Sequence, residues 1–153
     1  MALTPRPVSG TKFYVSATAP ATLTEAGYTA LTWTEVPGME NVPGFGDSYE
    51  IGTFNSVADG QYQYRSTRVA KTITTNMLDD LTNAGQVIMK AAFDAGLGTS
   101  AELISFKRED AAGRGQCARG FVSDFTLADG GSGDLQMRTV TIATIVGTTV
   151  EIS

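Results

Sequence analysis

One segment of the sequence has the apolar spacing of an amphipathic helix, and it constrains the fold more than any other feature. From Asp79 to Ala95, apolar residues recur at intervals of three and four. Asn76 or Asp80 is predicted to cap the start of this helix, and Gly96 to follow its end. A helix with such a stripe lays its apolar face on a sheet. The stripe consists of Leu78, Leu81, Gly85, Ile88 and Ala92, widened by Met89 and Phe93.

The rest of the chain has the residue types of strands and Gly-rich loops. Alternating or β-branched segments predict strands at residues 12–18, 30–36, 48–54, 69–75, 101–107, 116–127 and 135–146, and residues 148–153 form a short strand or tail. In the segment 135–146, Val140, Ile142, Thr144 and Val146 share one face with Arg138. The fold class is therefore mainly β with one flanking α-helix (α+β). The 153 residues form a single domain.

Two segments are predicted to extend from this domain. Pro5 and Pro7 make residues 1–10 an extended N-terminal arm. Residues 55–71 form a polar arm or loop, with a turn at Asp59-Gly60 and little to bury on either face. We expect this arm to gain its order from a neighbouring subunit, and Arg65, Arg68 and Lys71 to contact that subunit.

Composition argues against several functions. The net charge of -5 argues against a nucleic-acid-binding protein, because such proteins neutralise phosphates with Lys and Arg. The chain has no histidine, the commonest catalytic base and metal ligand, so we expect no enzyme and no cofactor. Cys117 is the only cysteine, which excludes a framework of disulfides within the chain. We interpret Cys117 as a small apolar residue of a strand. No signal peptide or membrane span is predicted.

Two charged or Gly-rich turns leave alternatives open. The segment ADGGSGD, residues 128–134, is interpreted as a hairpin loop; a phosphate loop lacks its Gly-Lys-Ser/Thr ending, and a calcium loop lacks EF-hand spacing. Lys107, Arg108, Glu109, Asp110 and Arg114 surround another turn. They form either a solvated turn or, for Arg108 and Arg114 in particular, a charged contact with an adjacent subunit.

The order of these elements resembles the major tail tube proteins of long-tailed, siphovirus-like bacteriophages. The resemblance covers nearly the whole chain. It rests on LTWTEVPGMENVPGFG, DSYEIGTF, the polar arm, KTITTNMLDD before the helix with NAGQ, and the closing VTIATIVG strand. It implies a β-sandwich or partial barrel of the phage tail tube type, whose sheets join into a closed multi-subunit barrel.

The resemblance also implies a function and a set of partners. Such subunits form hexameric rings that stack into the tail tube of the virion, the conduit for genome ejection into the host cell. The lumen holds the tape measure protein and then double-stranded DNA, without sequence-specific binding. Tail terminator and tail tip proteins are further partners, no membrane is involved, and assembly takes place in the host bacterial cytoplasm.

Physical arguments agree with a shared tube. One chain of this size has too few strands to enclose duplex DNA, so several copies must share one barrel. Carboxylates in the lumen would repel phosphates, and Glu50 and Asp124 are the candidate lumen positions. The alternatives are a tail terminator or neck ring protein, or a monomeric ligand- or carbohydrate-binding β-sandwich with Trp33, Tyr62 and Tyr64 as a stacking platform.

Overall fold

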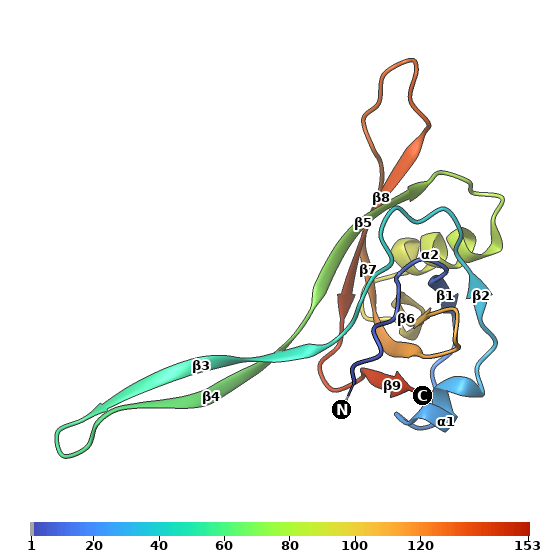
Figure 1. Cartoon of the computed structure of the whole chain (residues 1–153). Coiled ribbons are helices and arrows are strands. Elements are labelled where there is room, and N and C mark those ends of the chain that lie inside the picture. Colours follow the sequence, from blue (N-terminus) through green and yellow to red (C-terminus); the bar gives the residue numbers. More distant parts are fainter. Residues whose placement is uncertain (1) are drawn as a thin grey trace.

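The chain divides into a sheet-and-helix body and one long projecting hairpin (Figure 1). The computed structural model describes residues 2–153, so Met1, part of the predicted N-terminal arm, lies outside the described residues. Residues 2–7 contain no helix or strand and are exposed, as expected for an arm.

The body is built on one antiparallel sheet of seven strands. Its order is β2-β1-β6-β7-β8-β5, and β9 pairs with the first residues of β7. The strands are β1 (Lys12–Ser16), β2 (Thr34–Glu35), β5 (Thr72–Leu78), β6 (Leu103–Glu109), β7 (Gly115–Leu127), β8 (Met137–Thr144) and β9 (Val150–Ile152). The strands predicted along residues 12–18, 101–107, 116–127 and 135–146 are thus confirmed, whereas the predicted strand around Trp33 shrinks to the two residues of β2.

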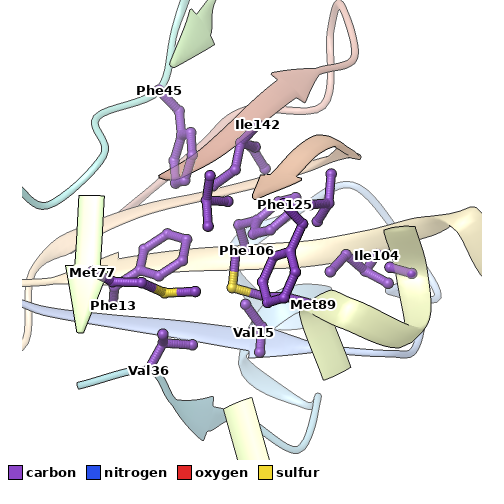
Figure 2. Packing of buried hydrophobic residues seen from close by; sticks show 14 residues of the cluster. Phe13, Val15, Val36, Phe45, Met77, Met89, Ile104, Phe106, Phe125 and Ile142 are labelled. Carbon is purple, nitrogen blue, oxygen red and sulfur yellow. The ribbon is translucent and has the colours of Figure 1, made fainter. Parts of the chain in front are cut away.

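Helix α2 (Ala84–Asp94) covers one face of this sheet and closes the hydrophobic core. Met89 from α2 and Val15, Phe106 and Ile142 from the sheet are fully buried, and Figure 2 shows them within one cluster. The stacked rings of Phe13 and Phe106 lie 5.9 Å apart between centroids, which adds aromatic contact to the apolar burial. The prediction that the helix lays its apolar face on a sheet is confirmed.

The helix begins later than its apolar stripe suggests. Its N-cap is Asn83, whose side chain accepts from the backbone N–H groups of Gly85 and Gln86, rather than Asn76 or Asp80. Leu78 belongs to β5, where it pairs with Met137 of β8, and its N–H donates to the carbonyl oxygen of Gly38 on the other side. At the other end, α2 stops at Asp94, and the backbone turns into the left-handed region at Gly98, not at Gly96. The predicted start and N-cap of the helix were therefore wrong, whereas its predicted end at Ala95 lies one residue beyond Asp94, and Gly96 follows the C-cap residue Ala95.

Arg138 is a buried cation on the core face of β8, as its place in the alternation predicts. Its Nε donates to Asp79 Oδ1 at 2.8 Å, and its guanidinium lies 4.6 Å from the centroid of the Phe125 ring. Because the charge is paired and stacked, its burial is tolerated. The pair ties β8 to the connection between β5 and α2.

A short helix, α1 (Glu25–Thr29), was not predicted from the Thr- and Ala-rich segment that contains it. Thr24 caps it, and the buried Tyr28 donates its hydroxyl to the carbonyl oxygen of Thr148 at 2.7 Å. Burial raises the pKa of Tyr28 to about 12. Trp33 Nε1 donates to the Tyr28 carbonyl oxygen, so the one tryptophan is part of this packing.

The second sheet consists only of β3 (Asp47–Ser56) and β4 (Gly60–Ala70), which form the projecting hairpin. Figure 1 shows it extending away from the body, so the two sheets do not stack as the predicted β-sandwich would. The predicted polar arm at 55–71 is real but begins earlier, at Asp47, because SYEIGTF pairs with the arm instead of joining the body sheet.

Candidate functional site

The hairpin has two chemically different faces. The register pairs Gly52 with Tyr64 and Phe54 with Tyr62, so these residues share one face with Glu50. A Cβ on Gly52 would lie 2.4 Å from Cζ of Tyr64, which shows that the Tyr64 ring lies over the glycine. We call the set Gly52, Phe54, Tyr62 and Tyr64 the aromatic face. It is exposed along a two-stranded sheet, which is marginally stable alone in water.

The opposite face carries the cations predicted from sequence. Arg65 lies 4.6 Å from the centroid of the Tyr49 ring and Arg68 5.9 Å from it. Arg68 also forms an ion pair with Asp47 at 2.7 Å. Lys71 follows β4, is exposed, and hydrogen-bonds through its backbone to Gly46. Their contact with another subunit stays a prediction, and within the chain Arg65 and Arg68 order Tyr49.

The hairpin is fixed to the body at its base by Asp47. The side chain of Asp47 is 6% exposed, and its Oδ2 accepts from Gly147 N at 2.9 Å as well as from Arg68. Gly147 lies in the turn after β8, far away in sequence. Sequence reasoning missed Asp47, since an aspartate just before a strand is ordinarily interpreted as a turn residue.

The turn between β6 and β7 is largely satisfied by its own chain. Arg108 Nη1 donates to the Val42 carbonyl oxygen at 2.8 Å, and Asp110 pairs with Arg6 at 2.6 Å. Backbone hydrogen bonds, first that from Arg114, hold the pKa of Asp110 below its ordinary value. Within residues 2–153 the Arg114 guanidinium has no hydrogen bond or ion pair. Arg114 is therefore the better candidate for a contact between copies, and Arg108 the poorer.

The sheet face opposite α2 is rich in threonine where β5, β8 and the end of β7 meet. Thr74 and Thr141 share a hydrogen bond at 3.0 Å, and Thr139 donates to Asn76 at 2.9 Å. Asp124 is the one charged residue among the described positions of this threonine face. These positions are Thr72, Thr74, Asn76, Phe121, Asp124, Thr126, Thr139, Thr141 and Ala143. Glu50, the other predicted lumen residue, lies on β3, so the two carboxylates belong to different sheets.

The sheet ends at β5, whose outer edge is only partly covered. Loop residues Gly38 and Glu40 hydrogen-bond to Leu78 and Asn76, at the end of the strand nearest α2. The half at Thr72–Thr74 lies next to the base of the hairpin and has no neighbouring strand on its outer side among residues 2–153. An uncovered strand edge is a template for pairing with another chain.

Other candidate sites do not gather into a chemical centre. No three His, Cys, Asp or Glu side chains in residues 2–153 lie together in a way that could hold a metal ion. Cys117 is buried, and burial raises the pKa of its thiol to about 12. Residues 128–134 form the loop between β7 and β8, as expected. No helix in the described part of the chain is long and apolar enough to cross a bilayer.

The aromatic platform of the ligand-binding alternative does not form. Trp33 directly precedes β2 in the body, whereas Tyr62 and Tyr64 lie on β4 of the projecting hairpin. Figure 1 shows β2 and the hairpin on opposite sides of the molecule. A stacking site needs these rings together, so the structure removes the main support for carbohydrate binding.

Comparison with known proteins identifies the fold. No protein family matches the sequence, and no curated protein matches it either. Among solved structures, the sheath/tube terminator of PVC, an extracellular contractile injection system, aligns over 100% of both chains with a TM-score of 0.68 and 13% identity. A chain of the PVC sheath–tube complex aligns over 97% of this chain and 92% of its own, with a TM-score of 0.65 and 14% identity.

A phage tail tube also matches, with a slightly lower TM-score. The SPP1 tail tube aligns over 96% of this chain and 78% of its own, with a TM-score of 0.64 and 13% identity. The chain thus has the fold that tail tube and tube terminator proteins share. Because contractile systems and a phage tail tube both match, the fold is not specific to siphovirus-like tails.

Proposed function

We propose that this protein is the structural subunit of a phage-type tail tube, with hexameric rings stacked into a conduit for DNA. The observation that carries the proposal is the β3–β4 hairpin. Ten residues of β3 span about 33 Å at the usual rise per strand residue. An ordered hairpin of that length with an exposed aromatic face acquires a stable environment when a neighbouring copy covers it.

The uncovered edge of β5 supports ring formation. Strand pairing between copies would satisfy the backbone groups at Thr72–Thr74 and join the seven-stranded sheets into a closed barrel. Cyclic symmetry then limits growth within one ring, whereas contacts along the axis repeat and build a tube. Six copies per ring is the number that the resemblance to tail tube proteins implies.

The threonine face is the surface we assign to the lumen. The hydroxyls of Thr74 and Thr141 share a hydrogen bond, that of Thr139 donates to Asn76, and Asp124 adds negative charge. The nearest cation on this face of β7 is Arg119, which donates to the Leu103 carbonyl oxygen. Phosphates passing over such a surface find no Arg or Lys to bind, which keeps DNA mobile. Glu50 extends the same negative lining only if the hairpin also faces the lumen.

The partners and location follow from this role. The tape measure protein and then double-stranded DNA would occupy the lumen, and tail terminator and tail tip proteins would cap the two ends. The protein would be assembled in the host cytoplasm and reside in the virion tail. Arg65, Arg68, Lys71, Arg108 and Arg114 are the proposed cations at contacts between subunits or rings.

Negative-stain electron microscopy of the purified protein tests the proposal, with a hairpin-deleted variant as its pair. Replacing residues 50–67 by Asn-Gly keeps the Tyr49–Arg68 pair and joins it by a favoured two-residue turn. We expect hollow tubes from the unmodified chain and folded, unassembled subunits from the variant. Dispersed monomers from the concentrated, unmodified chain would overturn the tube assignment. Tubes of normal length from the variant would show that the hairpin is dispensable.

The lumen assignment needs its own test. Glu50→Gln and Asp124→Asn remove both charges with little change in shape, so tubes should still form while DNA delivery slows. Ejection at the normal rate by particles carrying both substitutions would remove these residues from the lumen.

A terminator is the second candidate, because the PVC terminator aligns over the full length of both chains. A terminator would form single rings that do not stack. The same micrographs therefore decide between the two, since single rings at every concentration favour the terminator.

A further inference from the structure

A depression near the base of the body combines positive charge with an apolar wall. It has a volume of about 660 Å³ and lies between the N-terminal arm, the β6–β7 turn and β9. Pro7, Val8 and Ile152 contribute apolar surface, and Arg6, Arg108 and Arg114 contribute charge. We call it the arginine depression.

Its positive charge is only partly neutralised. Two side-chain carboxylates line it, those of Asp110 and Glu151, against three guanidinium groups. Asp110 is paired with Arg6, and Glu151 accepts from Gln116 at 2.7 Å. Arg114 is exposed and keeps its donors free within residues 2–153. The depression is therefore suited to a small apolar group next to a single negative charge.

The tip of the β3–β4 hairpin offers that combination. Val57 is fully exposed, although a valine side chain gains by burial. Two residues later, Asp59 is the only charged residue of the segment 55–61, and it is also exposed. Ser56 Oγ accepts from Asp59 N at 3.3 Å, which helps to order the turn. The Asp59 carboxylate raises the pKa of the Tyr62 hydroxyl through a hydrogen bond.

The two surfaces meet only between copies. Figure 1 shows the hairpin tip far from β9 and the N-terminal arm, so a tip cannot enter the depression of its own chain. The hairpin length of about 33 Å exceeds the radius of gyration of about 15 Å expected for 153 residues. One hairpin is thus long enough to extend well onto the surface of a neighbouring body.

We propose that the arginine depression of one copy receives the hairpin tip of another, with Asp59 on Arg114 and Val57 against Pro7, Val8 and Ile152. The inference rests on the proposed tube and names the site that holds its arm. Because the tip and the depression are different surfaces, the contact is heterologous and propagates from copy to copy. It fixes the direction in which every arm points.

The apolar groove beside the end of α2 is the rival site for the tip. It is lined by Phe93, Leu97, Phe121 and Val122, which would accept Val57. Its one charged lining residue is Glu102, however, and a carboxylate beside Asp59 is repulsive. Charge therefore selects the arginine depression.

Cross-linking between two variants tests the contact in assembled protein. Ala58→Cys places a thiol at the tip without removing Asp59, and Ala112→Cys places one beside Arg114. The native Cys117 is buried with a raised pKa, so it stays unreactive. A short bismaleimide should join mixed Ala58→Cys and Ala112→Cys subunits into a heterodimer. A heterodimer of Ala58→Cys with Leu97→Cys instead would overturn the proposal in favour of the apolar groove.

Charge reversal supplies the energetic test. Asp59→Arg alone and Arg114→Asp alone should each raise the concentration needed for assembly about tenfold, and the double variant should restore it. Asp129→Arg is the matched control, because Asp129 is likewise an exposed loop aspartate and its side chain has no hydrogen bond or ion pair within residues 2–153. If both reversals assemble like the unmodified chain, the docking is refuted while the tube stands. If the unmodified chain does not assemble and the cysteine variants do not cross-link, both the proposed tube and the proposed docking are refuted.

Discussion

Replacing Asp47 by Ala should loosen the hairpin from the body without unfolding the body. Asp47 Oδ2 accepts from Gly147 N and from Arg68 Nη2, and it is the side chain that joins the base of β3 to the turn after β8. The core cluster around α2 contains none of these three residues. The effect should therefore be local.

The magnitude follows from the two hydrogen bonds. A hydrogen bond to a charged acceptor contributes about 1.5–3 kcal/mol, and the pair with Arg68, which is 46% exposed, adds at most about 1 kcal/mol. The other carboxylate oxygen, Oδ1, is buried without a hydrogen-bond partner. Its removal is therefore favourable and offsets part of the stability lost with the two hydrogen bonds. A net loss of about 2 kcal/mol remains, which corresponds to about a 30-fold increase in opening of the junction.

Amide hydrogen exchange measures this opening directly. The Gly147 amide should exchange about 30-fold faster in Asp47→Ala, while amides of β6 and β7 keep their rates. Asp47→Asn is the matched control, because its amide oxygen can still accept from Gly147 and only the charge toward Arg68 is lost. Unchanged exchange at Gly147 in Asp47→Ala would refute the anchor, and a uniform increase over the whole body would show that the effect is not local.

Three further outcomes are expected. Met89→Ala removes a fully buried side chain, so it should lower the free energy of unfolding by about 3 kcal/mol and Tm by about 10 °C. Val87 is exposed, so Val87→Ala should change Tm little. Equal shifts of the two variants in a thermal scan would contradict this packing. The pKa of Asp110 is lowered, so its contribution to stability is present above the ordinary value of 3.8 and is lost as the pH falls through the lower folded value. An NMR titration of Arg6→Ala should still find that pKa below 3.8, because the backbone N–H of Arg114 is the largest cause; a return to 3.8 would assign the shift to Arg6. Tyr64→Ala should remove the ring from Gly52 and shift the Gly52 Hα resonance downfield, and an unmoved resonance would show that the ring lies elsewhere.

Parts of the candidate site could be predicted because the signal was local. The polar composition of residues 55–71 predicted a polar arm or loop, and in the structure these residues belong to the projecting hairpin. The cations Arg65, Arg68 and Arg114 were singled out by their placement on an arm or turn, and their contact with another copy stays a prediction. Sequence reasoning did not single out Asp47, Arg6 or Asp59 as contact residues. The partners of Asp47 and Arg6 lie far away in sequence, and the partner proposed for Asp59 lies on another copy.

The sequence by itself determined the longer strands of the body, β1, β6, β7 and β8, and which residues of β8 face the core. Val140, Ile142 and Arg138 were assigned to one face of β8 because side chains in a strand alternate, and this rule needs no knowledge of the partner strands. It also determined that one helix covers the sheet, since a stripe at spacings of three and four has no other way to be buried.

Only the tertiary structure decided where the helix begins and where β3 goes. Leu78 fits the apolar stripe, but its pairing with Met137 of β8 and its hydrogen bond to Gly38 hold it in β5, and α2 starts at Ala84 after the Asn83 cap. The sequence of β3 reads as an ordinary strand, but it pairs only with β4 and leaves the body. Hydrogen bonds between distant segments made both choices, because helix and strand propensities differ by only about 1 kcal/mol per residue and a single long-range contact outweighs them.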